Sequence, residues 1–95
     1  MKFRHILFNR VKSDAGFVVK IRMFQGFAEY REAGRVAIVP VKLIVGQAVA
    51  QVPKDAILKW KPPHDAEEIS EDKRREILQN VVAAMRFRKC SVEMI

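Results

Sequence analysis

Hydrophobic and polar residues alternate through much of the first half of the chain. The clearest alternation runs from residue 17 to residue 24, where Lys20 and Arg22 lie on one side and Phe17, Val19, Ile21 and Met23 lie on the other. A period of two places successive side chains on opposite faces of a strand, so this segment predicts a half-buried β-strand. We therefore expect Lys20 and Arg22 to face away from the core.

Turn residues divide the rest of this half into further strands. Phe3 to Val11 is apolar without clean alternation, which is typical of one strand at an edge or covered partly on both faces. Turn signals at 14–16, 25–26 and 33–34 leave strands predicted at 27–32, 35–45 and 47–52. Successive strands joined by short turns predict a β-meander.

Prolines interrupt two segments. Because proline cannot donate to a sheet, Pro40 makes the apolar stretch Arg35 to Val45 either an edge strand or two strands divided at Pro40. Pro62 and Pro63 exclude a regular element and require the chain to turn. Between Asp55 and Trp60, a single helical turn and a continuing strand both fit the residues.

One helix is predicted after this turn. Ser70 is suited to be its N-cap, and the acids that follow favour the positive end of a helix. Apolar residues then recur on one helical face, namely Ile77, Leu78, Val81, Val82, Ala84 and Met85. With a last strand at Ser91 to Ile95, the chain predicts an α+β fold: an antiparallel β-meander of about five strands packed on one long C-terminal helix, with a short final strand.

Size and composition narrow the class of protein. A chain of 95 residues, 49% of them hydrophobic, predicts a single domain over residues 1–95. No uncharged run is long enough for a membrane helix and the N-terminus lacks a secretory pattern, so we expect a cytoplasmic protein without membrane contact. The single cysteine, Cys90, excludes an internal disulfide and a thiolate zinc cluster.

Positive charge is concentrated in the strand-rich half. The formal net charge is +7, and residues 1–50 carry nine Lys and Arg against three Asp and Glu, whereas residues 51–95 carry nine against eight. A basic surface favours a polyanionic partner, either nucleic acid or an acidic protein surface. Simple solubility is the alternative explanation.

Candidate catalytic and metal-binding residues are few. His64-Asp65 is the only adjacent acid and base pair, and a capping or packing role of His64 in the turn explains it more simply. The acidic run from Asp65 to Asp72 lacks the spacing of a calcium loop and stands where helix N-termini ordinarily carry acids. No nucleophile motif and no glycine-rich phosphate loop is present. We expect no catalytic residue, no cofactor and no metal.

Aromatic rings in the basic half leave a second function open. Nucleic-acid modules present rings among basic residues, and the rings available are Phe3, Phe8, Phe17, Phe24, Phe27 and Tyr30. A small domain needs most of those rings for its core, and no RNP motif is present. A sheet-face nucleic-acid-binding module is therefore the alternative. Trp60 likewise has two interpretations, an exposed interface anchor or a plug at the end of the sheet.

The stretch around Trp60 resembles a known family. The motif from Ile57 to Asp65, Ile-Leu-Lys-Trp-Lys-Pro-Pro-His-Asp, followed by Ser70-Glu71 and a helix ending in Ala84-Met85-Arg86-Phe87-Arg88, is similar to small immunity proteins of bacterial polymorphic toxin and contact-dependent growth inhibition systems. The likeness extends upstream through Tyr30-Arg31-Glu32-Ala33-Gly34-Arg35. The resemblance implies a non-catalytic protein that binds one cognate toxin domain and blocks its active site or a neighbouring exosite.

We expect the toxin to meet the basic outer face of the sheet and its rims. Lys42 shares that face if its apolar neighbours in the same strand point inward. The candidate partner-binding residues are Lys20, Arg22, Arg31, Arg35, Lys42, Trp60, Lys61 and His64. Such a face would complement an acidic toxin surface.

Overall fold

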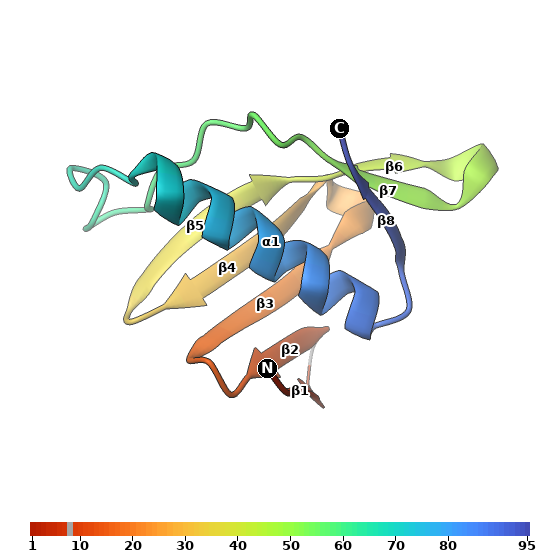
Figure 1. The fold of residues 1–95 in the computed structure, drawn as a ribbon, viewed down its shortest axis with the longest axis horizontal. Coiled ribbons are helices and arrows are strands. Elements are labelled where there is room, and N and C mark those ends of the chain that lie inside the picture. The colour runs from red at the N-terminus through yellow and green to blue at the C-terminus, as the bar shows by residue number, and fades with distance from the viewer. Residues whose placement is uncertain (8) are drawn as a thin grey trace.

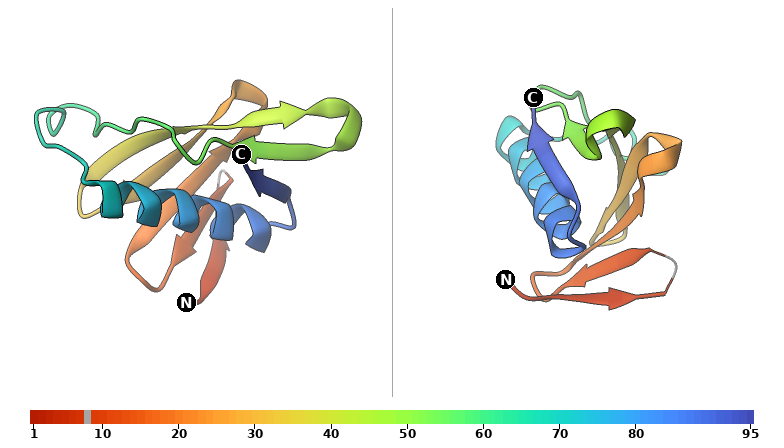
Figure 2. Two further views of the ribbon diagram at one scale, coloured as in Figure 1. Left: turned by 45° about the horizontal axis from the view of Figure 1, so that its top comes forward. Right: turned by 90° about the vertical axis from the view of Figure 1, so that its right-hand side faces the viewer.

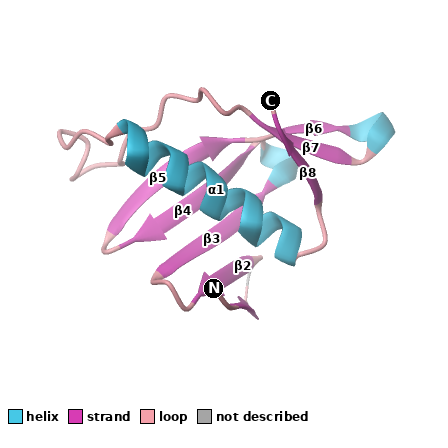
Figure 3. Cartoon of the chain, viewed as in Figure 1, coloured by secondary structure: helices cyan, strands magenta, loops and turns pink. Residues whose placement is uncertain are grey.

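Figure 1 shows the fold in a computed structural model, which describes residues 1–7 and 9–95. The elements are β1 (Phe3–Ile6), β2 (Arg10–Ser13), β3 (Phe17–Arg22), η1 (Met23–Gln25), β4 (Phe27–Glu32), β5 (Arg35–Pro40), β6 (Lys42–Ile44), η2 (Val45–Gln47), β7 (Val49–Val52), α1 (Glu71–Phe87) and β8 (Ser91–Met94). Helix, strand and loop are distinguished in Figure 3. The predicted α+β class is confirmed.

Strands β1 to β5 form one antiparallel sheet in chain order, which confirms the predicted meander. Helix α1 crosses one face of this sheet (Figures 1 and 2). The tight turn between β4 and β5 holds Ala33 and Gly34 at φ values of 52° and 78°. These values belong to the left-handed turns that join adjacent antiparallel strands.

The single strand predicted over Phe3 to Val11 is wrong. The chain forms a hairpin there, in which β1 and β2 pair antiparallel, with Phe3 opposite Ser13 and Ile6 opposite Arg10. Asn9 adopts a φ of 60°, which asparagine tolerates better than most residues and which helps to reverse the chain. Phe8, which belonged to that predicted strand, lies outside the described residues.

Pro40 divides its segment into two strands, one of the two predicted alternatives. β5 ends at Pro40, and β6 belongs to a second sheet of order β6-β7-β8. The predicted last strand is present as β8, but it pairs with β7 in parallel instead of joining the meander. Between Asp55 and Trp60 the chain forms a turn and then a single bridge from Trp60 to Ala37. Neither the predicted helical turn nor the predicted continuing strand is formed there.

The core lies between α1 and the sheet. All six apolar residues predicted for the inner face of α1 are buried. The predicted N-cap is also confirmed, because the Lys73 N–H donates to the Ser70 Oγ over 3.1 Å. Trp60 is 7% exposed and belongs to this core. Burial of a large apolar side chain contributes roughly 1.5–3 kcal/mol, so α1 and Trp60 together anchor the second half of the chain to the sheet.

Candidate partner-binding surface

The face of the five-stranded sheet opposite α1, here called the outer face, is strongly basic. In β3, Phe17, Val19 and Ile21 are buried, so alternation turns Lys20 and Arg22 outward, as predicted. The strand register extends this face to its neighbours. Its cationic residues are Arg4, Arg10, Lys12, Lys20, Arg22 and Arg31. Among the residues that the structure describes, one carboxylate, Glu29, shares the outer face.

Several cations of the outer face lie directly opposite one another. Arg4 pairs with Lys12 across β1 and β2, and Arg10 pairs with Lys20 across β2 and β3. Like charges in opposed positions destabilise a sheet. The Nε of Arg10 is also buried without a hydrogen-bond partner among the described residues. Lys20 also lies opposite Glu29 of β4, whereas Arg4, Arg10 and Lys12 have no carboxylate opposite them among the described residues.

Apolar residues adjoin the basic part of the outer face. Phe27 of β4 and Val36 and Ile38 of β5 point away from α1 and are only partly buried. The outer face thus changes from cationic on β1 to β3 to apolar on β4 and β5. Protein interfaces combine apolar side chains that carry affinity with charged side chains that guide association.

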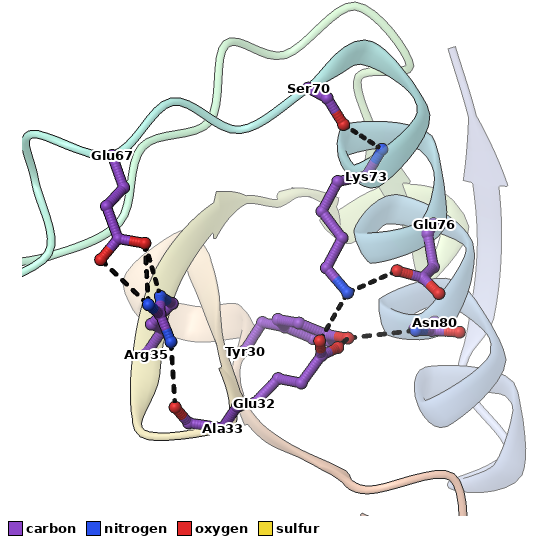
Figure 4. Close-up of polar contacts among 9 residues, drawn as sticks. All are labelled: Tyr30, Glu32, Ala33, Arg35, Glu67, Ser70, Lys73, Glu76 and Asn80. Atoms are coloured by element: carbon purple, nitrogen blue, oxygen red, sulfur yellow. Dashed lines mark hydrogen bonds and ion pairs between the residues drawn. The ribbon is translucent and has the colours of Figure 1, made fainter.

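Two of the predicted rim cations already have partners within the chain. Arg31 is half exposed and forms an ion pair with Glu29 over 3.2 Å. Arg35 forms a bidentate pair with Glu67, its Nε and Nη2 donating over 3.0 and 3.1 Å (Figure 4). Arg35 therefore ties β5 to the proline-rich loop. Lys42 is exposed but lies in the second sheet, so strand alternation does not place it on the outer face.

The three candidates of the Trp60 motif lie at the edge of β5 and in the loop beyond it. Trp60 is buried, which favours the plug over the exposed anchor. The Lys61 N–H donates to the carbonyl of Val36 over 2.7 Å, and its side chain is exposed. The backbone of His64 closes two successive turns, which agrees with its simpler predicted role. The structure therefore groups Lys20, Arg22 and Arg31 and leaves the other candidates elsewhere.

Sequence reasoning missed three cations of the outer face, Arg4, Arg10 and Lys12. The sequence pattern predicts a single strand from Phe3 to Val11. A single strand does not show how β1 and β2 pair, or which side chains share a face. The polar pair Asn9-Arg10 inside an apolar run was the signal for a hairpin. With that turn in place, the period of two assigns all three side chains to the side of Lys20.

A polar cluster joins the sheet to α1 on the inner side (Figure 4). The Tyr30 hydroxyl donates to Glu32 and accepts from the Asn80 Nδ2 over 3.1 Å, while the Lys73 Nζ donates to Glu32 and Glu76. Burial and the Glu32 hydrogen bond raise the pKa of Tyr30, so its hydroxyl stays protonated. Although desolvation opposes it, the Lys73 and Tyr30 hydrogen bonds lower the pKa of Glu32. This cluster holds α1 on the sheet.

Other kinds of site have little support. Phe3, Phe17 and Tyr30 pack with one another on the core side, with ring centroids of successive pairs 6.0 and 5.3 Å apart. These three rings are therefore not offered to nucleic-acid bases, whereas Phe24 is 93% exposed and Phe27 is partly exposed on the outer face. Within residues 1–7 and 9–95, no group of three or more His, Cys, Asp or Glu is placed to hold a metal ion. No described helix is long and apolar enough to cross a membrane.

Comparison with known families assigns the chain to a protein family. A model of the family Immunity protein 74 matches residues 20–95, from the middle of β3 to the end of the chain. Comparisons with curated proteins and with solved structures found no match. The family match agrees with the resemblance found at the Trp60 motif and covers most of the sequence. This chain belongs to the Immunity protein 74 family and is an immunity protein of a toxin system.

Proposed function

We propose that this immunity protein binds a cognate toxin domain through its outer face, in the cytoplasm, and neutralises it without catalysis. The toxin would belong to a contact-dependent growth inhibition or related polymorphic system. The observation that carries the proposal is the set of cations on the outer face, which lack ion-pair partners apart from Arg31 among the described residues. A partner with an acidic surface supplies the missing counter-charges.

The geometry of the outer face suits an interface of ordinary size. A stable complex buries about 800 Å² on each partner, and the molecule measures 39 × 27 × 22 Å, so one broad face is enough. The apolar residues Phe27, Val36 and Ile38 would supply affinity, while the cations of β2 and β3 would steer the encounter. Binding of this kind inhibits by covering the toxin's active site or a neighbouring exosite.

A nucleic-acid-binding module is the second candidate, because the same cations suit a phosphate backbone. The inward packing of Phe3, Phe17 and Tyr30 weighs against it. Binding through phosphates alone weakens steeply as salt rises. We therefore expect only weak, salt-sensitive association with RNA or DNA.

Co-expression with its toxin tests the proposed function. The chain is produced with the C-terminal domain of a large toxin, sought first in the gene directly upstream, and growth and co-purification are measured. We expect the pair to co-elute and the producing cells to grow. Absence of any complex with that domain, together with a sequence-selective nucleic-acid complex that persists at physiological salt, would contradict the proposal and favour the second candidate.

A further inference from the structure

The β1–β2 hairpin lies outside the segment that the family model matches, yet it is firmly joined to the rest of the fold. The match begins at residue 20, within β3. β2 pairs along β3, with Val11 opposite Val19. On the inner side, Phe3 packs against Phe87 at the end of α1, with ring centroids 5.5 Å apart. The hairpin is therefore an integral part of the sheet.

The hairpin adds a large share of the outer face's charge. Arg4, Arg10 and Lys12 all belong to it, and none forms an ion pair among the described residues. The nearest carboxylate in sequence, Asp14, accepts the Lys2 N–H over 2.9 Å in the turn that follows β2. The opposed pairs Arg4–Lys12 and Arg10–Lys20 therefore lack an acid between them within the part of the chain that the structure describes.

The hairpin also extends the exposed apolar surface. In the right-hand view of Figure 2 it runs beneath the other strands and reaches out on the side away from α1. At this end Leu7 is 77% exposed. The Asn9 carbonyl accepts the Ile21 N–H over 3.0 Å, which brings the hairpin beside η1, where Phe24 is 93% exposed. A hollow lined by Asn9, Arg22 and Phe24 lies between them.

We infer that the β1–β2 hairpin determines which toxin this protein recognises, and that it does so by receiving a carboxylate-rich surface of the toxin domain. This inference rests on the proposed function. Specificity is a difference between affinities, so it is set by contacts that one partner makes and another does not. The matched segment supplies Lys20, Arg22 and Arg31, whereas the hairpin adds charges and an apolar tip that the family pattern does not prescribe.

The charge on the toxin follows from the same contacts. Carboxylates placed between Arg4 and Lys12, and between Arg10 and Lys20, relieve the repulsion within each pair. A toxin domain with a basic surface would instead add like charges, which weakens binding. The toxin surface that meets the hairpin is therefore acidic.

A variant with two fewer positive charges in the hairpin tests this inference. Arg4→Gln with Lys12→Gln removes two exposed cations, and Lys54→Gln with Lys59→Gln removes two exposed cations from the segment between β7 and α1 as a matched control. Thermal melts establish folding, and binding kinetics are measured against the upstream toxin domain and against the toxin domain of another Immunity protein 74 system. We expect an unchanged melting temperature, about tenfold weaker binding of the cognate toxin, and a smaller difference between the two toxins.

The outcomes separate the inference from the proposed function. If the wild-type chain binds its toxin and the hairpin variant binds equally well with equal discrimination, the hairpin inference is wrong and the proposed function stands. If the wild-type chain does not bind the upstream toxin, the proposed function fails and the inference fails with it. A loss of affinity of equal size in the control would also overturn the inference, because net charge would then explain both.

Discussion

Trp60 is held at the edge of β5 by its bridge to Ala37 and by the apolar core beneath α1. Two residues later, Pro62 and Pro63 turn the chain away. The residue therefore joins the end of the extended segment to the sheet at a point where no regular strand continues. Its size makes it the main apolar contact of that segment.

Replacement of Trp60 by alanine is expected to destabilise the protein by about 3 kcal/mol or more, because it leaves a cavity in the core. Chemical unfolding followed by circular dichroism measures the change, because Trp60 is the only tryptophan and its fluorescence is lost in the variant. Ile57→Ala is the matched control, since Ile57 is 88% exposed in the same segment and should change stability very little. A Trp60→Ala variant with wild-type stability and lost toxin binding would show that the ring is an interface anchor.

Sequence patterns placed residues well where one strand or helix repeats apolar residues at a regular spacing on one of its faces. Lys20 and Arg22 follow from the alternation of β3, and the inner face of α1 follows from its helical spacing. Arg35 and Trp60 were harder to assign, because Trp60 had a functional and a structural interpretation and Arg35 was predicted only as a rim residue of the interface. A bidentate pair with Glu67 and a bridge to Ala37 are contacts between distant residues, and no local pattern reveals them.

At the scale of elements, the clamp between α1 and the meander depends on one carboxylate. Glu32 accepts from Tyr30 in the sheet and from Lys73 in the helix, and these bonds lower its pKa despite the opposing effect of desolvation. A group whose pKa is lowered by folding contributes stability above its unfolded pKa and loses it as pH falls through the folded pKa. The clamp therefore weakens in acid.

Glu32→Gln is expected to destabilise the protein by about 1 kcal/mol at neutral pH, a modest value because the pair is partly exposed. The difference from wild type should shrink as pH falls from about 4.3, the ordinary pKa of glutamate, through the lower pKa of folded Glu32, below which the wild-type carboxylate is protonated too. Unfolding curves over a range of acidic pH measure this. Glu68→Gln, at an exposed position without an ion pair among the described residues, should behave as wild type at every pH. A difference that stays constant through this range would contradict the charge-based explanation.

Element pairing was predictable only where neighbours in the chain are neighbours in the sheet. The meander from β3 to β5 follows from short turns, four residues long after β3 and two after β4, because such short connections favour antiparallel pairing. The parallel pairing of β7 with β8 joins residues 49–52 to residues 91–94 across the whole helix, and no turn specifies it. The division at Pro40 places β6 in that second sheet, which is why Lys42 could not be assigned to the face of Lys20.

At the scale of the whole molecule, charge is divided between two regions. The outer face carries cations that, apart from Arg31, form no ion pair among the described residues, whereas acids before and within the first turn of α1 are paired in Arg35–Glu67 and Arg74–Glu71. Ion pairs within the chain reduce the field of the acids near the start of α1, whereas the unpaired cations of the outer face keep a positive field that reaches into solvent. Long-range attraction of an acidic partner should therefore come from the outer face.

Reversal of Lys20 and Arg22 to glutamate is expected to slow association with the cognate toxin and to remove most of the salt dependence of its on-rate. The melting temperature should change little, since both side chains lie on the solvent side of β3. Association rates over a range of salt concentrations measure the effect, with Lys54→Glu and Lys59→Glu as the control of equal charge. Wild-type kinetics in a normally folded double variant would place the contact surface elsewhere, with the acidic run from Asp65 to Asp72 as the next candidate.

The opposed cations of the outer face also govern how copies of this protein meet one another. A two-fold symmetric dimer brings the same patch of each subunit together, so a dimer formed through this face would set Arg10 and Lys20 of one copy against the same cations of the next. Such contacts repel, and basic side chains along a sheet also discourage pairing of its exposed edge strands. We therefore expect crowded copies to keep this face open to solvent, so that a toxin bound as proposed would not first have to displace a second immunity protein.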